Sequence, residues 1–359
     1  MEYLLIKSLP YILIYGGIPF VVLFLILWSS PIALNAFKET VRQPYFLVVV
    51  FVSIFLLGIV SNLPLFTEQE DNVRMVRDMG LATATLCGLI VAIFSASTSI
   101  TEELEKKTAM TVLSKPVTRG HFIIGKYFGV VATSALAILI VGSVFILFLN
   151  VFGETLQQGE SLAARDPLTR QSALNRLNLE YLLNIKLMVP GLFLAFLQVS
   201  VLAGVCVVFA TRFNTILNVV ITSLIYVVGH IGNWLFNIIQ QSKAGVIGQG
   251  AGVMDVSEKA RRIMEAQNNV TLADYAWKVF YAVFPNLENF NASLSLSAGK
   301  LLESRLIDSF KYKYTLHWNL EKALPSIPDF ILANTVYAVV YISALLVISV
   351  LLLRNREIG

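Results

Sequence analysis

The chain has 359 residues, of which 56% are hydrophobic and 14% carry a charge, and its mean hydropathy is +0.72. A chain of this length and composition is too apolar for a water-soluble globule, so a membrane protein is indicated. The net charge of +4 is small and the cations are scattered along the chain, which argues against nucleic acid as the main partner.

Seven apolar runs are long enough to cross a bilayer, because roughly 20 residues of helix cover about 30 Å of hydrocarbon. Lipid offers the backbone no hydrogen-bond partners, and the runs lack the alternation of barrel strands, so the spans are expected to be helices. We predict an all-α polytopic membrane protein in which one extra helix precedes a six-helix set. The runs are Ser8–Phe37, Gln43–Thr67, Met79–Thr101, Tyr127–Gly153, Leu187–Thr211, Phe213–Ser242 and Phe330–Leu353.

The predicted organisation has four parts along the chain. They are the extra helix (1–37), the core of the bundle (38–242), an outer segment (243–329), and the last span with its tail (330–359). The outer segment has no run able to cross a bilayer, and long loops translocate largely regardless of their charge. Its aromatic stretch LADYAWKVFYAVFP is typical either of a helix at the headgroup boundary or of one packed within the segment.

The connection between the third and fourth runs carries the densest basic cluster among the short connections, so the positive-inside rule places it in the cytoplasm. Alternation then places the connection at Lys38 and Arg42, the turn at Arg212 and the C-terminal tail on the same side. Residues 68–78, residues 154–186 and the N-terminus are placed outside. The cluster consists of Lys106, Lys107, Lys115, Arg119 and Lys126.

Short signals divide this cytoplasmic connection into helices. The S-x-x-E pattern of Ser99–Glu102 is typical of a capping box, and Pro116 would end the short charged helix that it begins. Thr118 is expected to cap the next helix. On that helix, Gly125 and Gly129 form a small-xxx-small pattern, at which a second helix can approach closely.

The stretch GHFIIGKY (120–127) departs by one residue from the phosphate-loop pattern G-x-x-x-x-G-K-[ST]. A phosphate loop needs small residues, so that backbone amides can face the phosphates, and a hydroxyl for the metal ion. Here the intervening residues are bulky and Tyr127 stands at the hydroxyl position. We therefore predict no nucleotide site in this stretch.

The same stretch belongs to a longer pattern, EELEKKTAMTVLSKPVTRGHFIIGKY (102–127), which resembles the cytoplasmic loop of type-2 ABC transporter permeases. That loop commonly has an acidic residue, a Thr, leucines, Pro-Val-Ser-Arg and then Gly-Lys. The segment FKETVRQPYF before the second span is similar to the amphipathic connecting helix of the family, and FPNLENFN is similar to a recurrent outer segment. The matching loop positions are Glu103, Glu105, Thr108, Leu113, Pro116, Val117, Thr118, Arg119, Gly125 and Lys126.

The resemblance implies a permease half in the inner membrane, which dimerises with a second copy or a paralogue and docks cytosolic ABC ATPase subunits. This chain would bind no cofactor and would not itself be an enzyme, because ATP and Mg would sit on the partner ATPase. Closure of the ATPases would push a coupling helix at 101–119, within the coupling loop 101–126. The residues expected to couple to the ATPase are Glu102, Glu103, Glu105, Lys106, Thr108, Leu113, Pro116 and Arg119.

The charge-free interiors of the spans favour an apolar or amphipathic substrate and give no support to an ion-coupled carrier. We expect the transporter to be an exporter. The alternative is a non-transporting membrane scaffold that binds an extracytoplasmic partner protein. The three histidines lack metal-ligand spacing, so no metal site is expected. A possible substrate path is marked by His230, Asn233 and Gln198, although hydrogen bonding between helices is the commoner role of such residues.

Overall fold

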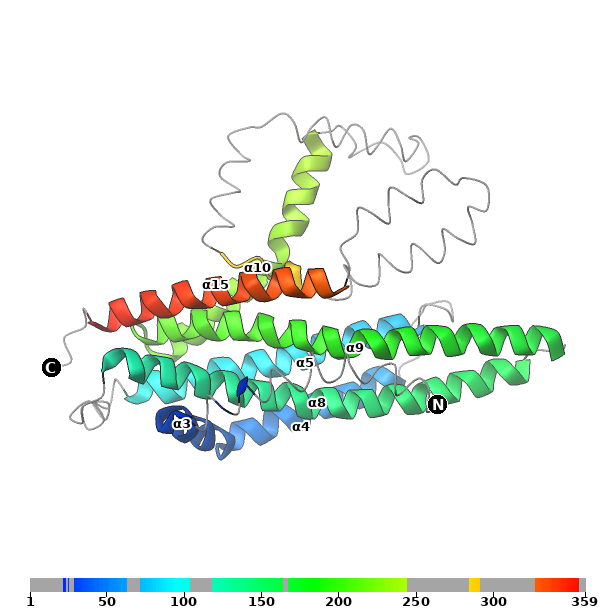
Figure 1. Cartoon of the computed structure of the whole chain (residues 1–359), viewed down its shortest axis with the longest axis horizontal. Coiled ribbons are helices and arrows are strands. Elements are labelled where there is room, and N and C mark those ends of the chain that lie inside the picture. Colours follow the sequence, from blue (N-terminus) through cyan, green and yellow to red (C-terminus); the bar gives the residue numbers. More distant parts are fainter. Residues whose placement is uncertain are drawn as a thin grey trace. The chain divides into compact units, whose positions relative to one another are not determined.

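A computed structural model describes residues 22, 23, 25, 29–62, 72–103, 118–163, 167–243, 284–290 and 327–354 (Figure 1). Within these residues every regular element is a helix, which confirms the predicted all-α class. The chain forms two compact units, Met1–Val219 with Phe290–Gly359 and Val220–Asn289.

The described helices follow the predicted runs in chain order. The boundaries between the two units fall within α10 and within η3. The elements are α3 (Pro31–Val41), α4 (Pro44–Asn62), α5 (Asn72–Ala96), the π-helix η2 (Ser97–Glu102), α8 (Arg119–Ala163), α9 (Pro167–Ala210), α10 (Thr215–Lys243), the 3-10 helix η3 (Leu287–Phe290) and α15 (Ile327–Arg354).

Four stretches of the described helices are long and apolar enough to cross a membrane, and they confirm the third, fourth, fifth and seventh predicted spans. A fifth is added if α3 and α4, which meet at a bend of 63°, count as one span. The apolar part of α10, Thr215–Ile231, is shorter, so the count of seven spans stays a prediction. The four stretches are Arg77–Thr101, Arg119–Phe148, Met188–Ala210 and Phe330–Arg354.

The predicted first span is wrong at its C-terminal end. Helix α3 begins at Pro31, after Ser30, whose Oγ accepts a hydrogen bond from Ala33 N at 3.4 Å. Proline suits the first helical position because its missing N–H would have no partner there. Residues 31–37 therefore belong to a short amphipathic helix that runs on to Val41, as the resemblance of FKETVRQPYF indicates. Most of the run from Ser8 lies outside the described residues.

Helices α8 and α9 extend beyond their apolar parts. Much of the stretch 154–186, expected only as an outer connection, is helical, because α8 continues to Ala163 and α9 starts at Pro167. Helix α9 also runs without interruption through Pro190. A proline removes one backbone hydrogen bond, which helices in a packed membrane bundle tolerate.

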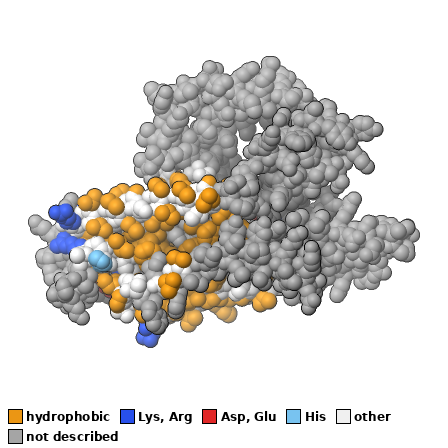
Figure 2. All heavy atoms as spheres, viewed as in Figure 1, with side chains coloured by type: hydrophobic (Ala, Val, Ile, Leu, Met, Phe, Trp, Pro, Cys, Tyr) orange, Lys and Arg blue, Asp and Glu red, His pale blue; other side chains and the backbone are white. Residues whose placement is uncertain are grey.

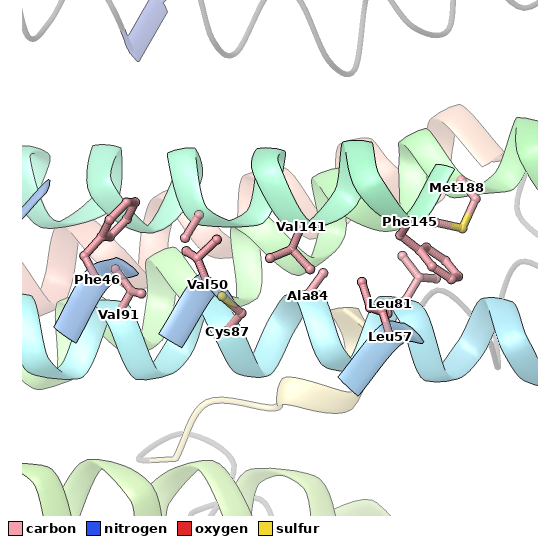
Figure 3. Packing of buried hydrophobic residues seen from close by; sticks show 11 residues of the cluster. Phe46, Val50, Leu57, Leu81, Ala84, Cys87, Val91, Val141, Phe145 and Met188 are labelled. Carbon is pink, nitrogen blue, oxygen red and sulfur yellow. The ribbon is translucent and has the colours of Figure 1, made fainter. Parts of the chain in front are cut away.

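The middle of the first unit is a cluster of apolar side chains from α4, α5, α8 and α9, which we call the middle cluster (Figure 3). Two glycines of α5 make room for side chains of α8. The ring of Phe145 lies against Gly80, and Ile138 Cδ1 lies 2.6 Å from where a Cβ on Gly88 would stand. The cluster comprises Phe46, Val50, Leu57, Leu81, Ala84, Cys87, Val91, Ala137, Val141, Phe145 and Met188.

Helix α9 is central and α15 is peripheral within the first unit. The apolar stretch of α9 is 72% buried, whereas that of α15 is 17% buried. Figure 2 shows hydrophobic side chains along the described helices and Lys and Arg side chains toward one end of them. An apolar outer surface of this kind suits hydrocarbon, because lipid tails are as apolar as the side chains that they cover.

In the second unit, the segment before η3 packs on α10. A Cβ on Gly229 would stand 2.7 Å from Leu287 Cδ1 and 3.1 Å from the carbonyl oxygen of Pro285. A Cβ at this position would press on both groups, so the glycine favours this close approach of the chain to the helix. Pro285 and Leu287 of FPNLENFN thus lie against α10, the last predicted span before the outer segment.

Candidate functional site

The connections that were predicted to share one side of the membrane meet at one end of the first unit. Thr101 Oγ1 donates to the carbonyl oxygen of Ala210 at 3.4 Å, and Lys126 joins α8 to α3. The C-terminus of α15 lies against the start of α8. We call this region, formed by α3, η2 with Glu103, the start of α8, residues 211–214 and the last turn of α15, the polar end. Its position in the cytoplasm stays a prediction.

Lys126 lies at the centre of the polar end. Its ammonium is 2.6 Å from Glu103 Oε1 and 3.8 Å from Glu39 Oε2, and it lies over the ring of Phe122 at 5.9 Å from the centroid. The side chain of Lys126 is only 6% exposed. An ammonium buried this deeply requires ionic partners, so the pair with Glu103 connects the end of η2 to α8 and the longer contact extends to α3.

Glu103 was predicted to couple to an ATPase, and the structure places its carboxylate on Lys126 of the same chain. The side chain of Glu102 is outside the described residues. The same holds for the whole of Glu105, Lys106, Thr108, Leu113 and Pro116. The pairing of Glu103 with Lys126 was missed because the two residues are 23 positions apart, and a sequence gives charges without saying which of them meet.

The start of α8 is capped as predicted. Thr118 Oγ1 accepts from His121 N at 3.3 Å, and the carbonyl of Thr118 accepts from Phe122 N at 3.2 Å. These bonds satisfy N–H groups that have no partner within the first turn of a helix.

Arg119 fastens the start of α8 to the end of α15. Its Nη1 donates to the carbonyl oxygens of Leu353 at 3.0 Å and of Arg354 at 3.2 Å. Carbonyls in the last turn of a helix lack N–H partners within that helix, and the negative end of the helix dipole favours a cation. This contact was also missed, since it joins residues more than 200 positions apart.

The predicted capping box at Ser99–Glu102 is wrong. Helix α5 continues directly into η2, and Ser99 Oγ is buried without a hydrogen-bond partner among the described residues. The chain has no need to break here because nearby hydroxyls bond within the helix, as Thr98 Oγ1 does to the carbonyl of Phe94 at 2.9 Å. A π-helical turn inside a longer helix is uncommon and occurs often at functional sites.

Neighbouring helices hold η2 through buried polar groups. Asn218 Nδ2, at the start of α10, donates to Ser97 Oγ at 3.0 Å and contacts Cys206 Sγ at 3.3 Å. Asn218 and Ser97 are fully buried. Together with the bond from Thr101 to Ala210, these contacts tie η2 to the end of α9 and the start of α10.

Gly125 and Gly129, which were expected to admit a second helix, lie against α3. A Cβ on Gly125 would stand 2.9 Å from Ile32 Cβ, and one on Gly129 would stand 2.6 Å from Ala36 Cβ. On its other side, α3 joins α5 through Thr40 Oγ1 and Ser95 Oγ, which are 2.9 Å apart. The polar end is therefore one interlocked body.

The residues of the predicted substrate path lie in different units. Gln198 is buried on α9 in the first unit, and His230 lies on α10 in the second. His230 Nδ1 donates to the carbonyl of Tyr226 at 2.9 Å, and the two rings are 4.4 Å apart. Asn233 lies in α10, but its side chain is outside the described residues. The substrate path stays a prediction.

Comparison with known proteins gave one family match. A family model described as "ABC-2 family transporter protein" matches residues 30–275, which is more than half of the chain. The match begins at the cap of α3 and includes α4, α5, η2, α8, α9 and α10. A search of curated proteins found no match.

Proposed function

The chain belongs to the ABC-2 family of transporter proteins, and we propose that separate ATPase subunits drive it by pressing on its polar end. As a member of this family it is a multi-pass permease component of an ABC transporter. ATP and Mg would be bound by the ATPase subunits. The segment 101–119 is their docking site in this proposal, which places the polar end in the cytoplasm and the chain in the inner membrane.

The observation that carries the proposal is the interlock at both described ends of this segment. Thr101 contacts α9, Glu103 contacts Lys126 of α8, and Arg119 contacts α15. A push on a segment anchored in this way moves several spans together, and rigid-body displacement of packed helices is a common route between two states. A loosely tethered loop would absorb such a push instead.

We propose export of an apolar or amphipathic substrate by a dimer of this chain, or by this chain with a paralogue. The apolar middle cluster and the apolar outer surface of α15 support cargo that moves along or between helices. Gln198, Asn233 and His230 are the polar groups proposed to line its path.

The test is a pull-down of the tagged full-length chain in mild detergent, followed by mass spectrometry. We expect recovery of a cytosolic ATPase with a phosphate loop, and hydrolysis by that ATPase that depends on the chain after reconstitution in vesicles. Recovery of an extracytoplasmic protein without an ATPase would overturn the proposal and favour a membrane scaffold.

Cysteine labelling in intact cells tests the membrane orientation of the segment 101–119, on which docking depends. A Lys106→Cys variant should resist a membrane-impermeant maleimide until the cells are permeabilised, whereas Glu68→Cys, on the opposite side by prediction, should react at once. The native Cys87 and Cys206 are buried, so their background labelling should be low. Labelling of position 106 in intact cells would contradict the docking proposal.

A further inference from the structure

The geometry of the polar end points to a role for Glu103 and Arg119 inside the permease instead of at the ATPase surface. We infer that both are positioning residues, which fasten the two ends of the segment 104–117 to the spans. Glu103 does so through Lys126 and Arg119 through the last turn of α15. This inference rests on the proposed function and assigns the residues through which the push is transmitted.

The contact between Glu103 and Lys126 has the geometry of an internal fastening. The ammonium and the carboxylate oxygen are 2.6 Å apart, and the side chains are 6% and 25% exposed. The second carboxylate, on Glu39, is 50% exposed and lies 3.8 Å from the ammonium, which is too long for a hydrogen bond. Glu103 therefore provides the close contact that lets Lys126 be buried.

Arg119 supplies the second fastening at the other end of the segment. Its guanidinium bonds to two backbone carbonyls of α15, which are present whatever side chains α15 carries. A cation at a helix C-terminus is favoured by the dipole and by the carbonyls that lack N–H partners. The segment 104–117 is thus bounded by two charged contacts, one from Glu103 to Lys126 of α8 and one from Arg119 of α8 to α15.

Lys126 distributes the displacement further, because it lies between the two glycines that seat α3. Its neighbour Gly125 contacts Ile32, and Gly129 contacts Ala36. A shift of Glu103 would therefore reach α8 through the ion pair, and α3 through the packed surface that surrounds it. Breaking the ion pair should weaken this transmission while leaving unchanged residues 104–117, the part of the docking segment that lies between the two fastenings.

The test exchanges the two charges. The variants Glu103→Lys, Lys126→Glu and the double exchange are made in a Glu39→Gln background. This removes the Glu39 carboxylate, which would otherwise repel a glutamate at position 126. The ATPase captured by the wild-type chain is the probe. For each single variant we expect normal co-purification of that ATPase but a fall of about tenfold in the hydrolysis that the chain stimulates. The double exchange should restore stimulation to within about twofold of the value for the Glu39→Gln chain.

If Glu103 bound the ATPase directly, Glu103→Lys would reduce co-purification, and the exchange at position 126 would not restore it. That result would overturn the inference. Lys126→Arg should keep stimulation because it keeps the charge, and Arg119→Met should lose stimulation while it keeps the ATPase. Lys38→Glu, at an exposed position of α3, matches the change in net charge of Lys126→Glu and should leave both measurements unchanged.

Failure of the proposed function has a different signature, because the wild-type chain itself would then recover no ATPase. The interaction between Glu103 and Lys126 can still be measured in that case, from the midpoint temperature of thermal unfolding of each variant in detergent. Each single exchange should lower the midpoint, and the double exchange should recover most of the loss. Additive losses would show that the two side chains do not interact and would overturn the inference.

Discussion

Several polar side chains beside the middle cluster bond to carbonyls of their own helices, whereas several of those at the polar end reach across to other helices. In the first region Thr85 Oγ1 donates to Leu81 and Ser134 Oγ donates to Val131. In the second, Asn218 donates to Ser97, Thr101 to Ala210 and Lys126 to Glu103. The two regions belong to the same helices and yet are held together by different forces.

The difference has a physical origin in the solvent. In a bilayer, apolar surfaces gain little by leaving lipid for protein, so helices associate through close fit and through polar contacts. The middle cluster depends on fit, with Phe145 seated against Gly80 and Ile138 against Gly88. The polar end adds directional contacts, each of which can break and re-form separately. That region is therefore the better place for two alternative arrangements of the same helices.

The largest expected effect comes from disturbing close fit where α3 crosses α8. In Gly129→Ala, the added methyl group would stand 2.6 Å from Ala36 Cβ and 2.9 Å from the carbonyl oxygen of Ala33. The backbone oxygen cannot rotate away, so α3 must shift. We expect a loss of about 3 kcal/mol in the free energy of unfolding, measured by titration with SDS in detergent micelles and far-UV circular dichroism.

The matched control is Gly120→Ala, at which a new methyl group meets Val350 at an ordinary 3.8 Å. This change should leave stability unchanged or raise it slightly, because alanine favours helix. Equal losses at the two glycines would mean that α3 does not pack on α8 as described.

The sequence predicted those features of the polar end that depend on neighbouring residues. Thr118 caps α8 and Gly125 with Gly129 admits a helix because each signal acts within about one or two helical turns. The same reasoning failed at Ser99, because a capping pattern does not reveal whether the preceding helix has already ended. The start of α3 at Pro31 had a local signal, but the long apolar run obscured it.

Contacts between distant parts of the chain were beyond prediction from one sequence. The charges of Glu103, Lys126 and Arg119 were evident, and the resemblance to the family assigned two of them to an ATPase. Their partners within the chain depend on how α8 lies against η2 and α15, which no local pattern specifies. The apolar runs likewise predicted the spans without predicting that α9 is central and α15 peripheral.

An intermediate effect is expected from a buried asparagine that bonds between helices. Asn218→Leu removes the donor to Ser97 and the contact to Cys206, and we expect a loss of about 1 kcal/mol in the free energy of unfolding. Asn334→Leu is the control, since Asn334 is also buried but its Nδ2 donates to the carbonyl of Phe330 in the same helix. The control should lose no more than about 0.5 kcal/mol. A larger loss for Asn334→Leu than for Asn218→Leu would contradict the distinction between a bond to another helix and a bond within one helix.

The smallest expected effect is the difference in stability loss between two threonine-to-valine substitutions, at Thr40 and at Thr85. Both threonines are buried, and they differ mainly in their hydrogen-bond partners. Thr40 Oγ1 donates to its own helix at Ala36, so its contact with Ser95 Oγ uses the Ser95 hydroxyl as donor. Thr40→Val removes that acceptor, and a loss of about 0.6 kcal/mol is expected, as for an average hydrogen bond between membrane helices. Thr85→Val removes only a bond to the Leu81 carbonyl, which the helix itself already engages, and should change stability by less than about 0.3 kcal/mol. Because the two substitutions delete the same atoms from buried sites, their difference measures what reaching across to another helix contributes, and equal losses would show that it contributes nothing.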